Sequence, residues 1–456
     1  MDVRIVVEVD GRKVSEIIES VETLDAMALE LRVEELKKRA GRAVLDSGFT
    51  QLGESLGRPH CCGRPMRNRG RRVRTVMSHS GEVTYERTRY RCRECQCWQT
   101  PADAVVCCGS HRMTRLLGRN ASQLASIEPF AQLEQLMADQ HGVYLGHDTL
   151  WHLALDVGGA LEKLRLAEVE LRQLHPWTAE NAPRPPVSPQ RIYISCDGIL
   201  YGTNETESNA QQPGVNQQKW RQMRPPQAVC GCARLRRAPR QRCETSRSRA
   251  VPWWHKQMTW GQEDDYLSFG MSLYALACRC GYHQAQEKIF LSDGADWCWS
   301  IQQEHFCEAS GVLDWYHASQ HVWECAKALF GDDSTAVQEW AQQHLSALYD
   351  AGGSGLLQLL EQCRSSPDDS LPQAAQKLSN YIRSRLAETD YPRYRSRGWT
   401  IGSGMVESSA KQLVGLRLKG PGMHWSRAGA TALTALRCAH LNGHWHQTWQ
   451  NLTLTG

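Results

Sequence analysis

A proline-rich segment limits how this chain can fold more than any other feature. Residues 175–190 read HPWTAENAPRPPVSPQ, and proline is excluded from helix interiors and from central strands. The segment therefore predicts a linker between two parts of the chain. The length of 456 residues agrees with such a division, since domains usually hold about 100–200 residues.

The N-terminal region, residues 1–56, is predicted to be largely helical. Residues 3–11 alternate in part and suggest a short strand, and residues 14–45 carry apolar side chains at helical spacing. Blocks of acidic and basic residues cover the opposite face of this helix. We expect the apolar face to pack on its own domain, with pairing to another subunit as the alternative.

Two further regions are expected before the linker. Residues 57–110 are rich in arginine and strand-like, with a hairpin turn at Ser80-Gly81. Residues 111–174 read as a helix, a glycine-containing turn and a second helix. This pattern is typical of a helix-turn-helix with residues 147–157 as its recognition element, although a plain helical hairpin has the same pattern.

Positive charge is concentrated in two segments of a chain whose net charge is only +4. Residues 58–95 hold eleven Arg against three Glu, and residues 219–249 hold ten Lys or Arg against one Glu. Such clusters indicate a polyanionic partner such as nucleic acid; the alternative is a pair of solvated loops. No apolar run reaches the length of a membrane helix, and the N-terminus has no signal-peptide pattern.

Three acidic residues follow or begin separate predicted elements. Asp197 is expected at the end of the strand RIYISCDG, Asp293 at the end of the strand KIFLSDG, and Glu407 near the start of a helix. Neighbouring strands lie about 5 Å apart, so such ends can bring acids together to hold divalent cations for phosphoryl transfer. An Asp-Gly turn without function is the alternative at each strand.

Four motifs in order resemble one family of enzymes. They are SCDG at 195–198, SDGADWCW at 292–299, LDWYHASQHVWECAKALFG at 313–331, and a long block from Gly402 to Arg437. Together they resemble the bacterial insertion-sequence DDE transposases of the ISKra group, which are related to the Mutator-like superfamily. The resemblance runs from about residue 60 to the C-terminus.

The resemblance implies a multidomain α/β protein with an RNase H-like catalytic core. The first part of that core would span residues 191–317 and its C-terminal part residues 399–456, with an all-helical insertion at 318–398 between them. The core would follow a helical segment, a zinc-ribbon-like hairpin and helix-turn-helix-like helices.

The resemblance also implies an activity. Asp197, Asp293 and Glu407 would bind Mg²⁺ (or Mn²⁺) for cleavage and strand transfer of double-stranded DNA at element ends and at the target. The protein would be a homo-oligomer in the transposition complex, in the bacterial cytoplasm and associated with the nucleoid. A domesticated DNA-binding protein and a nuclease without strand transfer are the alternatives.

A second motif, Asp314-Trp-Tyr-His317, resembles the (Cys/Asp)-x-x-His motif of Mutator-like enzymes. Residues three apart share a helix face, so the carboxylate and the imidazole are expected to touch. We expect the pair to support the active site or orient DNA; a buried ion pair is the alternative.

The cysteine pattern predicts a zinc ribbon. Cys92 and Cys95 form a C-x-x-C knuckle, and a hairpin separates them from Cys62. The family pattern has a further cysteine three residues before Cys62, where this chain has proline, so His60 or Cys61 is expected as the fourth ligand. Further cysteines lie close in the sequence: Cys97, Cys107 and Cys108.

Basic and aromatic residues alternate directly before the Glu407 block, in YPRYRSRGW at 391–399. Arginine contacts phosphate, and aromatic rings stack on bases. Beside three acids, which alone would repel DNA, these cations and those that follow are predicted to hold the DNA backbone. For each residue by itself, a solvated helix face is the alternative. The predicted DNA-binding residues are Arg393, Arg395, Arg397, Arg417, Lys419 and Arg427.

Overall fold

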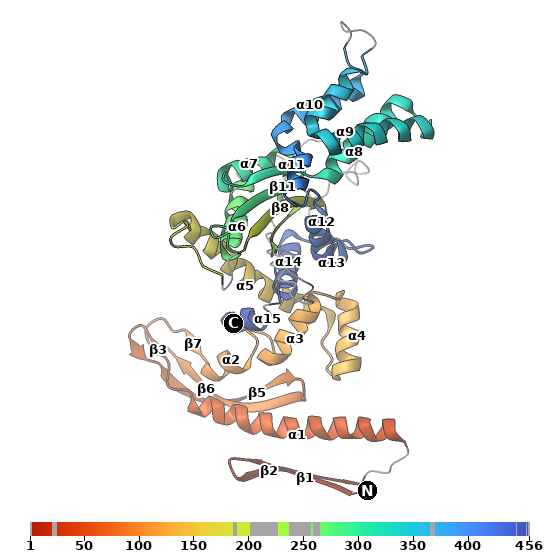
Figure 1. Cartoon of the computed structure of the whole chain (residues 1–456). Helices are drawn as coiled ribbons and strands as arrows, with labels where there is room; N and C mark the ends of the chain where they lie inside the picture. Colours follow the sequence, from red (N-terminus) through yellow and green to blue (C-terminus); the bar gives the residue numbers. More distant parts are fainter. Residues whose placement is uncertain are drawn as a thin grey trace, which may run out of the picture. The chain divides into compact units, whose positions relative to one another are not determined.

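The structure is a computed structural model of the chain (Figure 1). It describes residues 2–20, 25–185, 189–200, 227–236, 257–258, 265–364, 370–443, 445–452 and 454. Only the backbone is described at 197–200, 227–236, 257–258, 265–268 and 405–407. The chain forms two compact units, one of residues 1–161 with 444–456 and one of residues 162–443.

The first unit opens with a β-hairpin rather than with the predicted single strand and helix. Strands β1 (Asp2–Val9) and β2 (Arg12–Ser20) pair antiparallel around Asp10 and Gly11, whose φ angles of 49° and 72° are left-handed. Asp-Gly is a strong signal for such a two-residue turn. Helix α1 (Ala26–Ser55) starts only after the hairpin, where Asp25 caps it by accepting from the Ala28 N–H.

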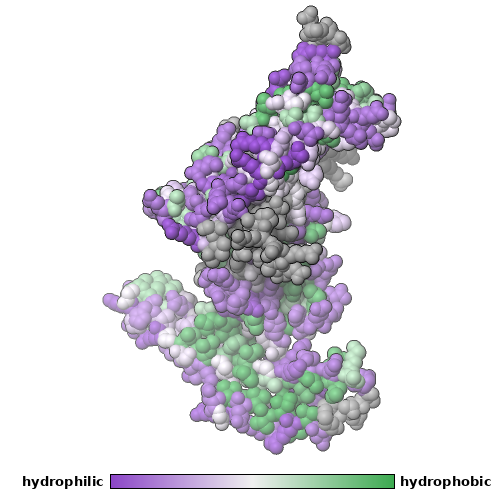
Figure 2. Space-filling view, in the orientation of Figure 1, coloured by the Kyte–Doolittle hydropathy of each residue, from purple (hydrophilic) through white to green (hydrophobic). Residues whose placement is uncertain are grey.

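Helix α1 packs on the hairpin and on the following sheet, as core packing predicts. Its Leu36 is buried. Other apolar residues stay exposed, among them Ile18 of β2 (70%), and Met27 (70%) and Leu31 (62%) of α1. Figure 2 shows hydrophobic residues gathered on the visible face of this hairpin and helix.

The arginine-rich region folds as strands, as predicted. The long strands β5 (Arg67–Ser78) and β6 (Gly81–Arg91) form an antiparallel ribbon whose turn is His79-Ser80, one residue earlier than expected. Three short strands flank the ribbon: β3 (His60–Cys61), β4 (Arg64–Pro65) and β7 (Trp98–Gln99).

Helices complete the first unit. They are α2 (Pro101–Val106), α3 (Arg115–Ala125), α4 (Phe130–His141), the first half of α5 (His147–Leu174), and α15 (Trp445–Asn451) near the C-terminus. Helix α4 ends at Gly142, whose φ of 56° is left-handed and suits a glycine C-cap. The predicted recognition element is the start of α5. The C-terminal helix is tied to this unit by Arg119, whose guanidinium lies 3.2 Å from Nδ1 of His446.

The second unit is built on a five-stranded mixed sheet. Its order is β10-β9-β8-β11-β12, in which β9 is antiparallel to both neighbours and β8, β11 and β12 are parallel. The apolar runs 192–194 and 289–291 are almost fully buried, as expected for strands covered on both faces. The strands are β8 (Arg191–Leu200), β9 (Gln227–Arg236), β10 (Gln257–Met258), β11 (Glu287–Ser292) and β12 (Ser310–Leu313).

Helices surround this sheet. In the view of Figure 1, α6 (Asp265–Arg279) and α7 (Asp296–His305) lie to one side of β8 and β11, and α12 (Gly404–Ala410) lies to the other. Helix α12 continues through a π-helical segment, η3 (Lys411–Gly415), into α13 (Leu416–Leu418), before α14 (Arg427–Leu441).

The secondary-structure elements described between β12 and α12 are all helices. They are α8 (Trp315–Phe330), α9 (Ser334–Glu361), α10 (Gln373–Ser384), the 3₁₀ turn η2 (Leu386–Thr389) and α11 (Tyr391–Ser396). Helix α9 is kinked at Gly352, whose φ of 70° and ψ of −166° are not helical. Glycine tolerates this conformation without a Cβ clash.

The proline-rich segment packs on the second unit, and the division between the units falls at residues 161–162, inside α5. The Tyr274 hydroxyl donates to the Trp177 carbonyl over 3.0 Å, and Ala182 is buried. Both Pro185 and Pro189 lie so close to Gly281 that a Cβ there would meet them within 3 Å. The described prolines therefore cover a surface. Within the described parts of the chain, no helix combines the length and apolar character needed to span a membrane.

Candidate functional site

The edge where β8 and β11 run side by side positions two of the predicted acids. Asp293 directly follows β11, as predicted. The strands are parallel with Phe290 opposite Ile194, and the Ser292 hydroxyl donates to the Cys196 carbonyl over 3.0 Å. The backbones of Asp197 and Asp293 therefore come next to each other on adjacent strands.

Asp197 does not lie at the end of its strand, which corrects the sequence-based expectation. Strand β8 continues to Leu200, and Asp197 pairs with Cys230 of β9. Strand β8 extends further than its parallel neighbour β11, because antiparallel pairing with β9 supplies backbone hydrogen bonds beyond the end of β11.

Glu407 is the fourth residue of α12, as predicted for a position near a helix start. Helix α12 packs against β8 and β9, the strand of Asp197 and its neighbour. The structure describes only the backbone of Asp197 and Glu407, so the convergence of the three carboxylates stays a prediction.

The loop that carries Asp293 is held by its own hydrogen bonds. One carboxylate oxygen of Asp293 accepts from the Ala295 N–H over 3.0 Å, and its carbonyl accepts from Nε1 of buried Trp299 over 2.8 Å. Asp293 itself is half-buried. Its position is therefore set before any ligand binds.

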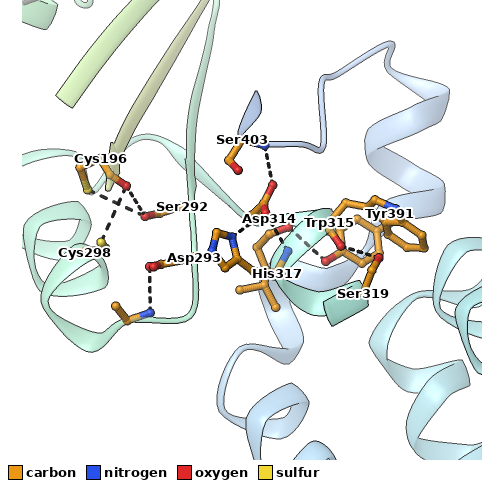
Figure 3. A network of polar contacts seen from close by, with 12 residues as sticks. Cys196, Ser292, Asp293, Cys298, Asp314, Trp315, His317, Ser319, Tyr391 and Ser403 are labelled. Atoms are coloured by element: carbon orange, nitrogen blue, oxygen red, sulfur yellow. Dashed lines mark hydrogen bonds and ion pairs between the residues drawn. The ribbon is translucent and has the colours of Figure 1, made fainter. Parts of the chain in front are cut away.

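Asp314 and His317 are in contact, as predicted, although Asp314 is the N-cap of α8 and precedes the helix (Figure 3). Asp314 is fully buried. Its Oδ2 lies 2.8 Å from both the backbone nitrogen and Nδ1 of His317, and its Oδ1 accepts from the Ser403 N–H. Its own N–H donates to the Ser292 carbonyl over 2.8 Å.

The two residues between Asp314 and His317 hold the same loop as Asp314. The Trp315 N–H donates to the Ile401 carbonyl over 2.9 Å, and the Tyr316 ring lies so near Gly402 that a Cβ there would come within 2.7 Å of it. The motif therefore clamps residues 401–403, directly before the helix of Glu407, to the end of β11.

Tyr381 of α10 is a residue that the sequence reasoning missed. Its ring covers Gly294, where a Cβ would lie 2.3 Å from Cε2, and its centroid is 4.1 Å from that of His321. Burial raises the pKa of the Tyr381 hydroxyl, and the carboxylates of Asp293 and Asp314 raise it further. The only signal in the sequence was the glycine after Asp293, which also fits an ordinary turn.

The predicted DNA-binding cations divide into exposed and internal groups. Arg395 donates to the Tyr349 carbonyl over 2.9 Å and stacks on its ring at 3.5 Å. Arg417 is only 1% exposed and lies 5.3 Å from the Trp425 ring, which disagrees with a contact to DNA phosphate at the surface. The remaining four are exposed: Arg393, Arg397, Lys419 and Arg427.

Four cysteines of the first unit form a cluster that could hold a metal ion such as zinc. The sulfurs of Cys61, Cys62, Cys92 and Cys95 all lie within 4.8 Å of one another. Sulfurs that bind one tetrahedral zinc at about 2.3 Å are expected to be this close. Of the two residues expected as the fourth ligand, Cys61 completes the set and the exposed His60 lies outside it.

The loop geometry suits such a cluster, and hydrogen bonds among the thiols shift their pKa values in opposite directions. The Cys92 N–H donates to the Cys97 carbonyl over 2.9 Å, which closes the second knuckle. Backbone and thiol hydrogen bonds from Cys97, with those from other thiols, lower the pKa of Cys95 to about 6. Hydrogen bonds between thiols raise the pKa of Cys61 and of Cys62 to about 12, and the bond with Cys95 is the largest cause for both.

Comparisons with known proteins leave the family of this chain open. No protein-family model and no curated protein matches the chain, so no sequence match supports the ISKra or Mutator-like resemblance. Among solved structures, the chain is similar to one in the "Drosophila P element transposase strand transfer complex". The identity is 10%, the TM-score is 0.26, and the alignment covers 75% of this chain and 82% of that chain.

The Asp314 clamp can be tested by protein stability. We expect Asp314→Ala to lower the free energy of unfolding by about 2–4 kcal/mol, because it leaves several buried N–H groups without their acceptor. Asp333→Ala is the matched control, since Asp333 caps α9 at an exposed position and such a cap is worth about 1 kcal/mol. Urea unfolding measures both; an equal loss would contradict the clamp.

The contact between Gly294 and Tyr381 can be tested by a double-mutant cycle. Gly294→Ala should destabilise the protein by about 1–3 kcal/mol, because the new Cβ overlaps the ring, and adding Tyr381→Ala should recover part of the loss. Gly48→Ala is the control, because a Cβ there meets nothing within 4 Å. Equal effects of Gly294→Ala with and without Tyr381 would disprove the contact.

The ligand set of the cysteine cluster can be tested by metal analysis. Protein purified without chelator should contain about one zinc per chain, and Cys61→Ser should reduce that content while His60→Ala keeps it. Cys97→Ser is the matched control, since this sulfur lies 3.5 Å from that of Cys61 but outside the set of four. Loss of metal in His60→Ala would restore histidine as the ligand.

Proposed function

We propose that this protein is a DDE DNA transposase with an RNase H-like core, in which Asp197, Asp293 and Glu407 are the catalytic acids. The main observation in favour of this proposal is the parallel pairing of β8 and β11. The hydrogen bond between Ser292 and Cys196 lies beside the two aspartates. A mixed sheet with one antiparallel strand next to β8, and a helix of the C-terminal part packed on β8, support this proposal.

The donor set suits a hard divalent cation. Carboxylate oxygens are the ligands that Mg²⁺ and Mn²⁺ prefer, and Asp293 is already held by Ala295 and Trp299. A bound Mg²⁺ pair would stabilise the attacking and leaving oxygens of a phosphodiester. The role of the three acids is to hold these ions at the sheet edge where the scissile phosphate binds.

Asp314 is a positioning residue in this proposal. Its carboxylate and its N–H connect the end of β11 to residues 401–403, so the strand before Asp293 and the loop before Glu407 move as one piece. His317, with Nδ1 on the Asp314 carboxylate, turns its other ring nitrogen away from that carboxylate. Asp314 and His317 therefore support the acids and are separate from the metal ligands.

DNA is the proposed partner of both units. The second unit would hold the backbone by charge with its exposed cations near the Glu407 block. The first unit, which carries the cysteine cluster and the arginine-rich ribbon, would bind element ends. Paired cleavage at two ends makes a homo-oligomer the expected active form.

One reaction separates this function from its alternatives. Protein, Mg²⁺ and a linear DNA cut from the flanks of the gene are incubated with a supercoiled target plasmid. A transposase yields joined products; a nuclease yields nicks without joining; a domesticated binder only shifts the DNA. Joined products support the proposal, and either other result contradicts it.

The catalytic acids are tested by charge removal at constant shape. Asp197→Asn and Asp293→Asn should each lower cleavage by about 1,000-fold or more, which is ~4 kcal/mol of barrier, while DNA binding persists. Asp296→Asn is the matched control, because that carboxylate lies three residues further on and is 98% exposed. A variant of Asp293 that cleaves as fast as the Asp296 variant would exclude Asp293.

A further inference from the structure

The surface at the start of α5 is poorly suited to enter a DNA groove. Its exposed residues include His147, Asp148 and His152, and the Asp148 side chain is 94% exposed. The first Lys or Arg after His147 is Lys163, four helical turns further on. Among the described residues, Asp148 has only His147 beside it, at 3.6 Å, and an acid repels phosphate. The start of this helix therefore carries no Lys or Arg to bind the DNA backbone.

The β5–β6 ribbon presents the opposite character. Arg67, Arg69, Arg72 and Arg93 are exposed, and the described residues offer none of them a carboxylate at ion-pair distance. Arg67 stands directly opposite Arg91 across the ribbon. Like charges in such a pair are unfavourable by themselves, and an anion bound between them removes that cost.

A tryptophan orders the arginines on one face of this ribbon. Trp98 is 47% exposed and pairs with Arg91 through β7. The guanidinium carbons of Arg89 and Arg91 lie 4.3 and 5.4 Å from its ring centroid. Alternate and cross-strand residues share a face of a sheet, so Arg67 lies on the same face. The stacked guanidinium groups are pre-organised to donate in pairs.

The cysteine cluster fixes the end of the ribbon that carries these arginines. Cys92 directly follows Arg91, the last residue of β6, and its sulfur belongs to the cluster of four. Beyond Arg72, the inner face of the ribbon is closed by Asp103 of α2, which binds Arg74 and Arg87. The arginine-bearing end is therefore anchored by the cysteine cluster and lies beyond the part of this face that α2 covers.

We propose that the β5–β6 ribbon enters the major groove of duplex DNA and reads guanine with Arg67, Arg89 and Arg91, in place of helix α5. The major groove admits a two-stranded ribbon, and paired donation from arginine to guanine O6 and N7 is its commonest specific contact. This inference rests on the proposed function in one respect only: the proposed function identifies the DNA sequence that the ribbon reads as the end of a transposable element.

The test uses the full chain and a library of random 20-bp duplexes. Wild-type protein selects a bound sequence, which is then probed by methylation interference at guanine N7 in the major groove and adenine N3 in the minor groove. The ribbon variant is Arg67→Gln/Arg89→Gln/Arg91→Gln, and a second variant changes the same residues to lysine. The matched control alters α5 through His147→Ala/Thr149→Ala/His152→Ala. Zinc content and circular dichroism verify that each variant is folded.

Guanine N7 methylation should block wild-type binding, and the glutamine variant should bind the selected duplex at least about 10-fold more weakly and lose its preference. The lysine variant should keep its affinity for random duplex but lose discrimination at guanine, because lysine keeps the charge without the fork. The α5 variant should select the wild-type sequence.

Four results would each overturn the inference. They are selection of no sequence, interference confined to adenine N3, a ribbon variant with unchanged preference, and an α5 variant without preference. Ribbon-dependent binding in a chain that never cleaves DNA would support it while contradicting the transposase proposal.

Discussion

The buried carboxylate of Asp314 is the interaction on which the geometry of the second unit depends. A charge removed from water costs several kcal/mol unless donors surround it. Here the donors come from His317 and from Ser403, which are 86 residues apart in the sequence, while the Asp314 N–H binds Ser292. Since these bonds form only when the strand, the helix and the loop have met, the carboxylate links the end of β11 to the start of α12.

This linkage explains how a long helical segment can separate two parts of one site. The chain leaves the sheet after β12, forms helices α8 to α11 and returns at residue 400. Thr400 then donates to the Tyr193 hydroxyl in β8 over 2.9 Å, and Ser403 donates to Asp314. The insertion also returns to the site through Tyr381, whose ring covers Gly294. Its helices therefore contribute to the shape around Asp293.

The first unit depends on a different constraint. Its ribbon extends beyond the small core around Val76 and Tyr85. A metal ion bound by the four sulfurs would add stability at that end, as structural zinc does in small folds. Rigid placement of Arg89 and Arg91 against Trp98 follows from the same local structure.

Much of this arrangement is local and could be predicted from sequence. The buried runs before Asp197 and Asp293, the Cys92–Cys95 knuckle and the contact of Asp314 with His317 all depend on residues within a few positions of one another. Periodicity and spacing are local properties, so they are visible in a single chain.

The tertiary structure alone decided the rest, because those features depend on contacts between distant residues. Strand β9, not the apolar pattern, extends β8 past Asp197. Folding back of the first knuckle places Cys61 rather than His60 beside Cys95, 34 residues away. Packing around Trp425 buries Arg417, whereas Lys419 two positions later stays exposed. Each of these outcomes depends on contacts that form only when the chain is folded, and such contacts cannot be read from a single sequence.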